Sequence, residues 1–177
     1  MNNVAEQKIP FNFTYYAMKL LGKNLYSNPW TAISEIVANG IDSGAPNVYV
    51  LVDMRNKAHS IVEIFDDGSG MSYDDLCNKY TLIGRNKRET LDNIEGKTLG
   101  RKGIGKLAAL YLSPQYYLTT KTKNEKSCWT VNTTLFSDND VPTMNKIAGE
   151  ELFVIAKDKW DSCSTGTMIH LSNVNLT

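Results

Sequence analysis

The sequence has few cysteines and no pattern that would pair them. Its three cysteines, Cys77, Cys128 and Cys163, are odd in number and far apart, and none belongs to a CxxC or Cys/His arrangement. Neither a disulfide framework nor a zinc site is therefore expected. Reduced thiols indicate a reducing compartment, so we expect a cytoplasmic protein, or a nuclear one in a eukaryote.

Long apolar runs and an excess of one charge are also missing. No run approaches the roughly 20 apolar residues of a membrane span, and the N-terminus lacks a basic-then-apolar signal, so we expect no membrane partner. The 19 basic residues equal the 19 acidic ones, which gives no support for a surface directed as a whole at nucleic acid or lipid. With 177 residues, 42% of them hydrophobic, the chain can form one substantial core.

The charge is nevertheless unevenly distributed along the chain. Residues 84–106 carry seven basic and three acidic side chains, so this segment is +4 and the rest is −4. Residues 84–102 are polar and have little periodicity, and loops longer than about 12–15 residues in compact domains are usually functional or disordered. A solvated loop is one interpretation of this charge. The glycine-rich turn at its end favours phosphate binding instead.

Apolar periodicity predicts helices at three places. Residues 30–43 have apolar side chains at near-helical spacing, and Gly44-Ala-Pro46 should end that helix. A buried helix is expected over Ile104–Leu112. Part of residues 9–29 should also be helical and should end at Asn28-Pro29, because proline disfavours helical geometry in the residue before it.

Runs of β-branched and aromatic residues predict the strands. Asn47–Met54 and Ser60–Phe65 flank a polar turn and predict an antiparallel pair, and Ser72 is a candidate N-cap for a short helix after them. Four later strand candidates are Gln115–Lys121, Ser127–Leu135, Glu151–Ala156 and Thr167–Leu171. The order of helix, strands, helix and strands predicts an α+β two-layer sandwich.

The first of three ordered motifs, Glu35-Ile-Val-Ala-Asn39-Gly-Ile-Asp42, lies on the first of these helices. Its polar residues fall at i, i+4 and i+7 and so share one face. A glutamate on a rigid helix can act as a general base towards water. An asparagine one turn away can supply an oxygen ligand to Mg²⁺. A plain polar helix face is the alternative for this motif taken alone.

The second motif, Asp66-Asp-Gly68-Ser-Gly70-Met71, follows the second predicted strand. Gly68 and Gly70 allow the backbone to approach a flat ligand closely. A carboxylate at the end of a strand can accept a hydrogen bond from the exocyclic amine of adenine, a group that guanine lacks at that position. An ordinary Asp-Gly turn is the alternative.

The third motif, Gly100-Arg-Lys-Gly103-Ile-Gly105-Lys106, runs directly into the second helix. Its glycines free backbone amides to point inward, and the N-terminal end of the helix favours an anion. The spacing of a Walker A loop is absent. One glycine-rich turn is a weak signal, but three motifs in this order predict a site that binds and hydrolyses a nucleoside triphosphate.

Together the motifs resemble the nucleotide-binding domain of the GHKL superfamily, which includes gyrase B, the ninety-kilodalton heat-shock chaperones, sensor histidine kinases, MutL and the MORC proteins. The resemblance spans roughly Pro29 to Leu171. It implies the Bergerat fold, a mixed and mostly antiparallel sheet covered on one side by helices, with ATP held between helices and a lid. Residues 29–177 would form this domain, residues 1–28 an N-terminal arm and helix, and residues 84–102 the lid.

The resemblance also implies roles for single residues. Glu35 matches the general base, Asn39 the Mg²⁺ ligand and Asp66 the residue that reads the adenine amine, while Asp42 matches an acidic position near the nucleotide. The remaining matched positions are implied to bind the nucleotide or to shape its site: Gly68, Gly70, Met71, Gly84, Lys87, Gly100, Arg101, Lys102, Gly103, Ile104, Gly105, Lys106 and Thr167.

This resemblance implies a domain that binds ATP with Mg²⁺, hydrolyses it slowly and acts as a switch, in which ATP closes the lid and favours a homodimer. Gly40 departs from the alanine usual in the family, which should loosen the helix by about 0.5–1 kcal/mol. An interaction module with negligible hydrolysis is the first alternative. A protein kinase of the same superfamily is the second, although the acid at Asp42 argues against a sensor kinase.

The partners that the resemblance implies extend beyond the nucleotide. In gyrase B, MutL and the heat-shock chaperones, a second domain contributes a lysine or arginine to the terminal phosphate, and Thr177 precedes any such domain. We therefore expect an N-terminal fragment, or a domain that needs a downstream domain or partner to complete catalysis. A nucleic acid client and a protein client both fit this domain.

Overall fold

A computed structural model of the chain describes residues 8–10, 12–13, 26–56, 60–83, 105–113, 115–132, 143–148, 154–174 and 176. Seven of the strands in these residues form one sheet in which every neighbouring pair is antiparallel. Their spatial order is β1 (Lys8–Pro10), β8 (Thr143–Ile147), β7 (Lys126–Asn132), β6 (Gln115–Lys121), β9 (Gly166–Ser172), β4 (Ile61–Asp66) and β3 (Val48–Asp53). A short parallel pair, β2 (Asn12–Phe13) with β5 (Leu82–Ile83), lies apart from this sheet.

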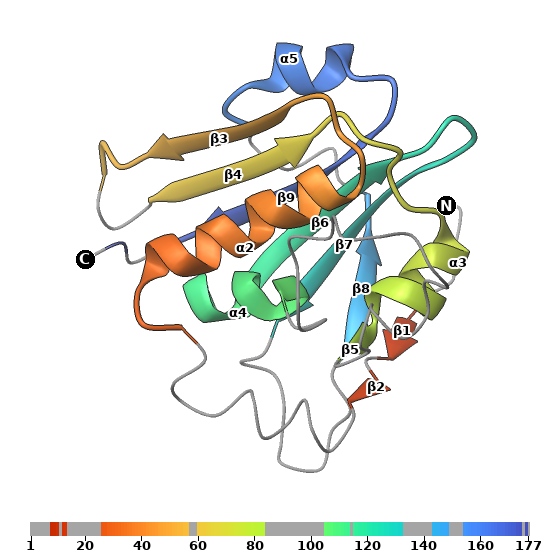
Figure 1. The fold of residues 1–177 in the computed structure, drawn as a ribbon, viewed down its shortest axis with the longest axis horizontal. Coiled ribbons are helices and arrows are strands. Elements are labelled where there is room, and N and C mark those ends of the chain that lie inside the picture. The colour runs from red at the N-terminus through yellow and green to blue at the C-terminus, as the bar shows by residue number, and fades with distance from the viewer. Residues whose placement is uncertain are drawn as a thin grey trace, which may run out of the picture.

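Helices α2 (Pro29–Asp42), α3 (Tyr73–Asp75) and α4 (Ala108–Leu112) lie on one side of the sheet (Figure 1). A π-helical turn, η2 (Leu76–Tyr80), continues α3, and a 3₁₀ turn, η3 (Gly105–Leu107), leads into α4. The predicted α+β sandwich is therefore confirmed, and in its described residues the main sheet is antiparallel throughout. None of the helices in the described part of the chain has the length and apolarity that a bilayer crossing requires.

The side-chain alternation of β4 determines which residues face the helices. Val62 and Ile64 belong to the main core between the sheet and α2 and α4, whereas Phe65 packs on the opposite face. Successive side chains of a strand point to opposite faces, so Asp66 returns to the helix side. The last residue of β4 is thereby directed toward the α2 side of the molecule.

The first helix begins one residue earlier than its periodicity suggests, and the reason corrects the interpretation of Asn28-Pro29. This dipeptide starts a helix and does not end one: Pro29 occupies the first turn of α2, where its missing N–H costs nothing. Asn28 is the N-cap, and its side-chain oxygen accepts a hydrogen bond from the Thr31 amide at 3.0 Å. The helix expected within residues 14–25 lies outside the described residues.

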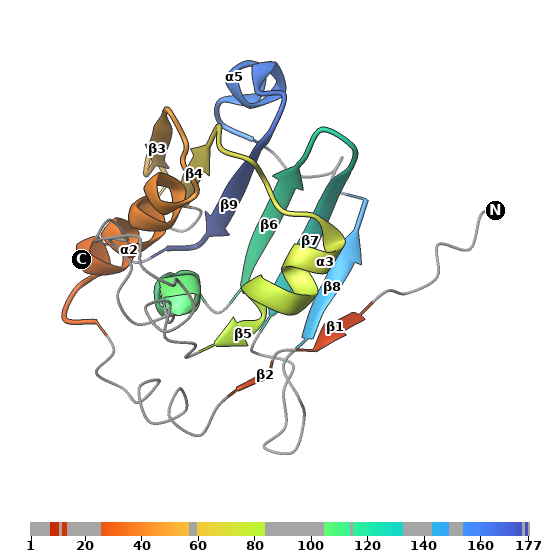
Figure 2. The ribbon, with the colours of Figure 1, turned by 45° about the vertical axis from the view of Figure 1, so that its right-hand side comes forward.

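The C-terminal third contains the clearest error of prediction. The expected strand Glu151–Ala156 is wrong over its described residues, because Val154 is irregular and the next two residues form a turn into α5 (Lys157–Ser162). This short helix packs Trp160 against Phe65 and Met168, so it covers the sheet face opposite α2 (Figure 2).

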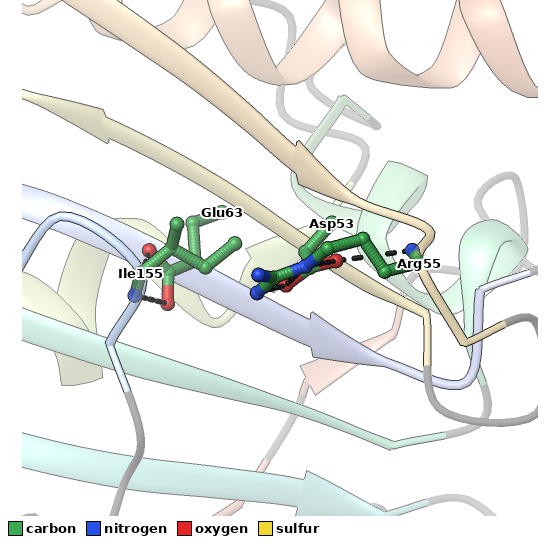
Figure 3. A network of polar contacts seen from close by, with 4 residues as sticks. All are labelled: Asp53, Arg55, Glu63 and Ile155. Carbon is green, nitrogen blue, oxygen red and sulfur yellow. Dashed lines mark hydrogen bonds and ion pairs between the residues drawn. The ribbon is translucent and has the colours of Figure 1, made fainter.

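A buried carboxylate holds the segment before α5 against the sheet. Both oxygens of Glu63 accept the amide N–H of Ile155 at 2.8 Å (Figure 3). His170 Nδ1 lies 3.0 Å from Glu63 Oε1. The Glu63 side chain is fully buried. Because an unpaired buried carboxylate is costly, these two partners explain why a glutamate is tolerated inside the protein.

Candidate functional site

A cavity of about 320 Å³ opens between α2, the ends of β4 and β9, and the start of α4. Its wall is mostly apolar with a few polar groups, which is typical of a small-molecule site. The residues that line it are Ile36, Asn39, Gly40, Asp42, Ser43, Val48, Ile64, Asp66, Gly70, Met71, Lys79, Tyr80, Gly105, Ala109, Thr167 and Ile169. Seven of the residues singled out from the sequence are therefore brought to one cavity: Asn39, Asp42, Asp66, Gly70, Met71, Gly105 and Thr167.

Helix α2 presents its polar stripe to this cavity and to the chain beside it. Asn39 and Asp42 line the cavity, and Glu35 lies one turn further toward the N-terminus of α2. A methyl group built on Gly105 would lie 2.9 Å from Glu35 Oε2 and 3.4 Å from Asn39 Nδ2. The acid and the amide therefore converge on the backbone of Gly105, where η3 begins.

Asp66 is the buried carboxyl group of the cavity. It is 8% exposed, and its Oδ1 accepts the Gly68 amide at 2.9 Å. Burial raises the pKa of Asp66 from 3.8 to about 6, an effect that hydrogen bonds from the Gly68 and Thr167 amides partly oppose. The antiparallel register of β4 and β9 places Asp66 directly opposite Thr167, so these two predicted residues form one side of the cavity.

The loop after β4 is held in place by β6. The Thr120 hydroxyl accepts the Met71 amide at 2.7 Å and lies within donating distance of the Met71 carbonyl, at 3.2 Å, and the Gly166 carbonyl, at 3.4 Å. Gly70 adopts a φ of +67°, and a methyl group there would collide with the carbonyl oxygen of Lys121. Only glycine fits this turn without strain, which explains the second glycine of the motif.

Three predicted positions lie close, in the sequence or in space, to the residues that line the cavity. Gly68 is buried behind Asp66, where a methyl group would meet the Ser43 hydroxyl and lie 2.8 Å from Asp66 Oδ1. Glu35 adjoins Gly105. Lys106 is described only as part of the backbone of η3. The lid expected over residues 84–102 and the predicted contacts Gly84, Lys87, Gly100, Arg101, Lys102, Gly103 and Ile104 lie outside the described residues.

Sequence reasoning missed several cavity residues. Lys79 and Tyr80 line the cavity from η2, and Ser43 reaches it from the C-terminal end of α2. Lys79 forms an ion pair with Asp75 one turn earlier, at 2.5 Å, and the Tyr80 hydroxyl is hydrogen-bonded to that of Tyr116 at 3.0 Å. The signal in the sequence was the capping box at Ser72, which starts a helix directly after Met71. Side chains of that helical segment could be expected close to the cavity that Met71 lines.

The donors in this site fit a hard cation only in part. Among the described residues, no group of three or more histidine, cysteine, aspartate or glutamate side chains could enclose a metal ion. Mg²⁺ is commonly bound through one or two carboxylates together with substrate phosphates and water. Asn39 at the cavity wall offers one amide oxygen, a hard ligand, and the other ligands would have to come from phosphates and water.

Comparison with known proteins agrees with this geometry. The family model described as histidine kinase-, DNA gyrase B-, and HSP90-like ATPase matches residues 26–167, and the chain therefore belongs to this GHKL family. It is similar to the DNA mismatch repair protein MutL of Pseudoalteromonas translucida, with 26% identity over 114 residues, 64% of this chain and 18% of the relative. MutL of Pseudomonas fluorescens shares 30% identity over 118 residues, 66% of this chain and 18% of that protein.

A relative of another kind has the higher identity over a shorter alignment. The putative type II restriction enzyme HgiDII of Herpetosiphon aurantiacus shares 37% identity over 99 residues, 55% of this chain and 15% of that protein. The chain thus matches less than a fifth of the length of these curated relatives. The family, the fold and the cavity identify an ATP-binding module.

Proposed function

We propose that this module binds ATP with Mg²⁺ and hydrolyses it slowly, as the nucleotide-driven switch of a larger protein. The observation that carries the proposal is the convergence of Glu35 and Asn39 on Gly105, beside a cavity that has Asp66 in its wall. Phosphoryl transfer depends mainly on positioning and on stabilising charge. A rigid helix that aligns a base and a metal ligand supplies the positioning.

The adenine end of the ligand lies, in this proposal, against Asp66 and Thr167. The carboxylate accepts the exocyclic amine of adenine, and the apolar wall formed by Ile64, Met71 and Ile169 contacts the flat base. An acceptor at this position favours adenine over guanine. Adenine pairs its amine with the carboxylate, whereas guanine would leave the buried carboxylate without a donor.

The phosphate end lies toward Glu35, Asn39 and the turn that ends at Gly105. Asn39 would hold Mg²⁺, which neutralises charge that develops on the phosphates. Glu35 accepts a proton from the attacking water. Gly105 permits this arrangement, because a side chain at its position would crowd both Glu35 and Asn39.

Substitution of Glu35 tests the hydrolytic half of the proposal. Glu35→Ala should lower ATP turnover by at least about a hundredfold, the usual contribution of a general base, and should leave ATP affinity within about twofold. Phosphate release and calorimetry measure the two quantities in the full-length protein. Asp158→Asn, on α5 at the opposite face of the sheet, is the matched control and should behave as wild type.

The outcomes of this experiment separate the candidate functions. Turnover that survives Glu35→Ala would remove Glu35 as the base. Tight ATP binding with no turnover in the wild-type full-length protein would favour a nucleotide-gated interaction module.

We propose DNA as the client of this module, because the relatives are by name a DNA mismatch repair protein and a putative restriction enzyme. Duplex DNA should therefore be added to the same turnover assay. Unchanged turnover with DNA would argue against this client.

The switch itself is an equilibrium between free and associated copies. A ligand shifts such an equilibrium only by binding one state more tightly, so ATP must favour the dimer. Light scattering of the full-length protein should show a monomer without nucleotide and a dimer with a non-hydrolysable ATP analogue. The same oligomeric state under both conditions would contradict the switch.

A further inference from the structure

The hydroxyl group of Tyr26 is buried and has no hydrogen-bond partner among the described residues. Tyr26 is 9% exposed and belongs to the core between α2 and the sheet. A buried polar atom without a partner is rare in folded proteins and requires an explanation. Phenylalanine would fill the same space without leaving a polar atom unpaired, so packing alone does not account for a tyrosine here.

The contacts of the Tyr26 ring place this residue beside α4, which packs against α2. The ring packs edge-to-face on Tyr111 of α4, with 5.2 Å between the ring centroids. Tyr26 thereby lies where the N-terminal part of α2 meets α4, and Glu35 extends from α2 toward Gly105 at the start of the same α4 segment. The two elements that flank Tyr26 are the two that position Glu35.

The carboxylate of Glu35 contributes to the raised pKa of Tyr26. Burial, with the nearby Glu35 carboxylate as the second cause, raises the pKa of Tyr26 to about 12. At neutral pH the hydroxyl therefore keeps its proton and can act as a donor. A buried donor without a partner and a carboxylate within electrostatic reach are complementary groups.

We propose that Tyr26 is a positioning residue for Glu35, donating a hydrogen bond to its carboxylate when nucleotide is bound. The inference rests on the proposed role of Glu35 as general base. The bond orients the carboxylate toward the attacking water and satisfies the Tyr26 hydroxyl. Hydrogen bonds to charged groups are among the stronger ones. Loss of the Tyr26–Glu35 bond should therefore affect chiefly the step in which Glu35 accepts a proton from water.

Tyr26→Phe removes only the hydroxyl and is the direct test. In the full-length protein we expect kcat for ATP to fall about tenfold, while the ATP dissociation constant rises by only about threefold, because the bond forms on nucleotide binding but matters most for orienting Glu35. Stability to denaturant should stay the same or rise, because the variant no longer buries an unpaired hydroxyl. Tyr111→Phe removes the hydroxyl of the neighbouring, more exposed ring and should have wild-type kcat. A wild-type kcat for Tyr26→Phe would overturn the proposal.

A spectroscopic measurement decides the question even where turnover is slow. With ¹³C-labelled tyrosine and a non-hydrolysable ATP analogue, the Cζ resonance of Tyr26, assigned by its loss in Tyr26→Phe, should shift on Glu35→Gln. An unshifted resonance would overturn the proposal. If Glu35→Ala keeps full turnover, the proposed function of Glu35 fails. If Glu35→Ala is inactive while Tyr26→Phe keeps wild-type kcat and Glu35→Gln leaves the Tyr26 resonance unshifted, only the role of Tyr26 fails.

Discussion

At the scale of single residues, the site depends on a carboxyl group that the protein keeps away from water. Asp66 is buried, and two backbone amides only partly offset the cost of its charge. Because its pKa is higher in the folded chain than in the unfolded one, Asp66 contributes stability that is full below about pH 4 and is lost as the pH rises through about 6. The charged form is thus held at a cost, as is common at functional sites.

ATP binding should have the opposite dependence on pH. In the proposed binding mode the adenine amine donates to the ionised Asp66 carboxylate, so affinity should fall as the pH drops below about 6. We expect the dissociation constant to rise about tenfold from pH 7 to pH 5, since each unit below the pKa costs up to a factor of ten. Calorimetry on wild type and Asp66→Asn separates this effect from the titration of ATP itself. Equal pH dependence in both proteins would contradict it.

The predicted site residues that the structure brings to or beside one cavity are those whose grouping follows from local spacing. The stripe of Glu35, Asn39 and Asp42 needs only the helical period, and the Asp66–Gly70 turn needs only the end of a strand. Lys79 could not be found in this way, because the capping box at Ser72 predicts that a helix begins there but not that a side chain of η2 reaches the cavity. Residues brought in by tertiary packing leave no short-range pattern.

At the scale of elements, the strands with two well-defined ends were predicted best. Gln115–Lys121 coincides with β6, and the antiparallel pairing of β3 and β4 is confirmed. α5 was missed because six residues are too few for a helical period, and an apolar run before it was interpreted as a strand. β8 was not predicted: it is short, and it pairs with β1 and β7 from distant parts of the chain.

The loop between β4 and α3 offers a test of how tightly the elements are connected. Gly70→Ala should destabilise the fold by about 2 kcal/mol or more, because it combines an unfavourable φ with a collision against the Lys121 carbonyl. Gly44→Ala is the matched control: its φ is +76°, but nothing lies within 4 Å of the added methyl group. Gly44→Ala should therefore cost only about 1 kcal/mol.

Urea unfolding monitored by circular dichroism measures both variants. The difference between them isolates the collision with β6 from the cost of the backbone conformation. Equal losses of stability would mean that the loop can move away from β6. That result would contradict the view that Thr120 and Lys121 hold the loop rigidly at the cavity.

At the scale of the whole molecule, the two faces of the sheet have different tasks. The face under α2 and α4 carries the larger core and the cavity, while α5 and the buried Glu63 cover part of the other face. This separation allows Asp66 and Thr167 to face the cavity while their neighbours Phe65 and Met168 pack against Trp160 on the other side of the sheet. Because successive side chains of a strand point to opposite faces, β4 and β9 each contribute to the cavity on one face and to packing on the other.

The account as a whole stands on one claim, that the cavity recognises adenine through Asp66. Calorimetry at pH 7.5 with Mg²⁺ should show that wild type binds ATP at least about tenfold more tightly than GTP, since an unpaired buried polar group costs about 1–3 kcal/mol. Asp66→Asn should lose this preference. Its side-chain NH₂ group would face another donor, either the adenine amine or the backbone amides of Gly68 and Thr167. Asp67→Asn alters the contact with Asn47 and removes a charge that helps to raise the pKa of Asp66, so at pH 7.5 this variant should keep the preference. Equal affinity for ATP and GTP in wild type, or an unchanged preference in Asp66→Asn, would contradict the claim.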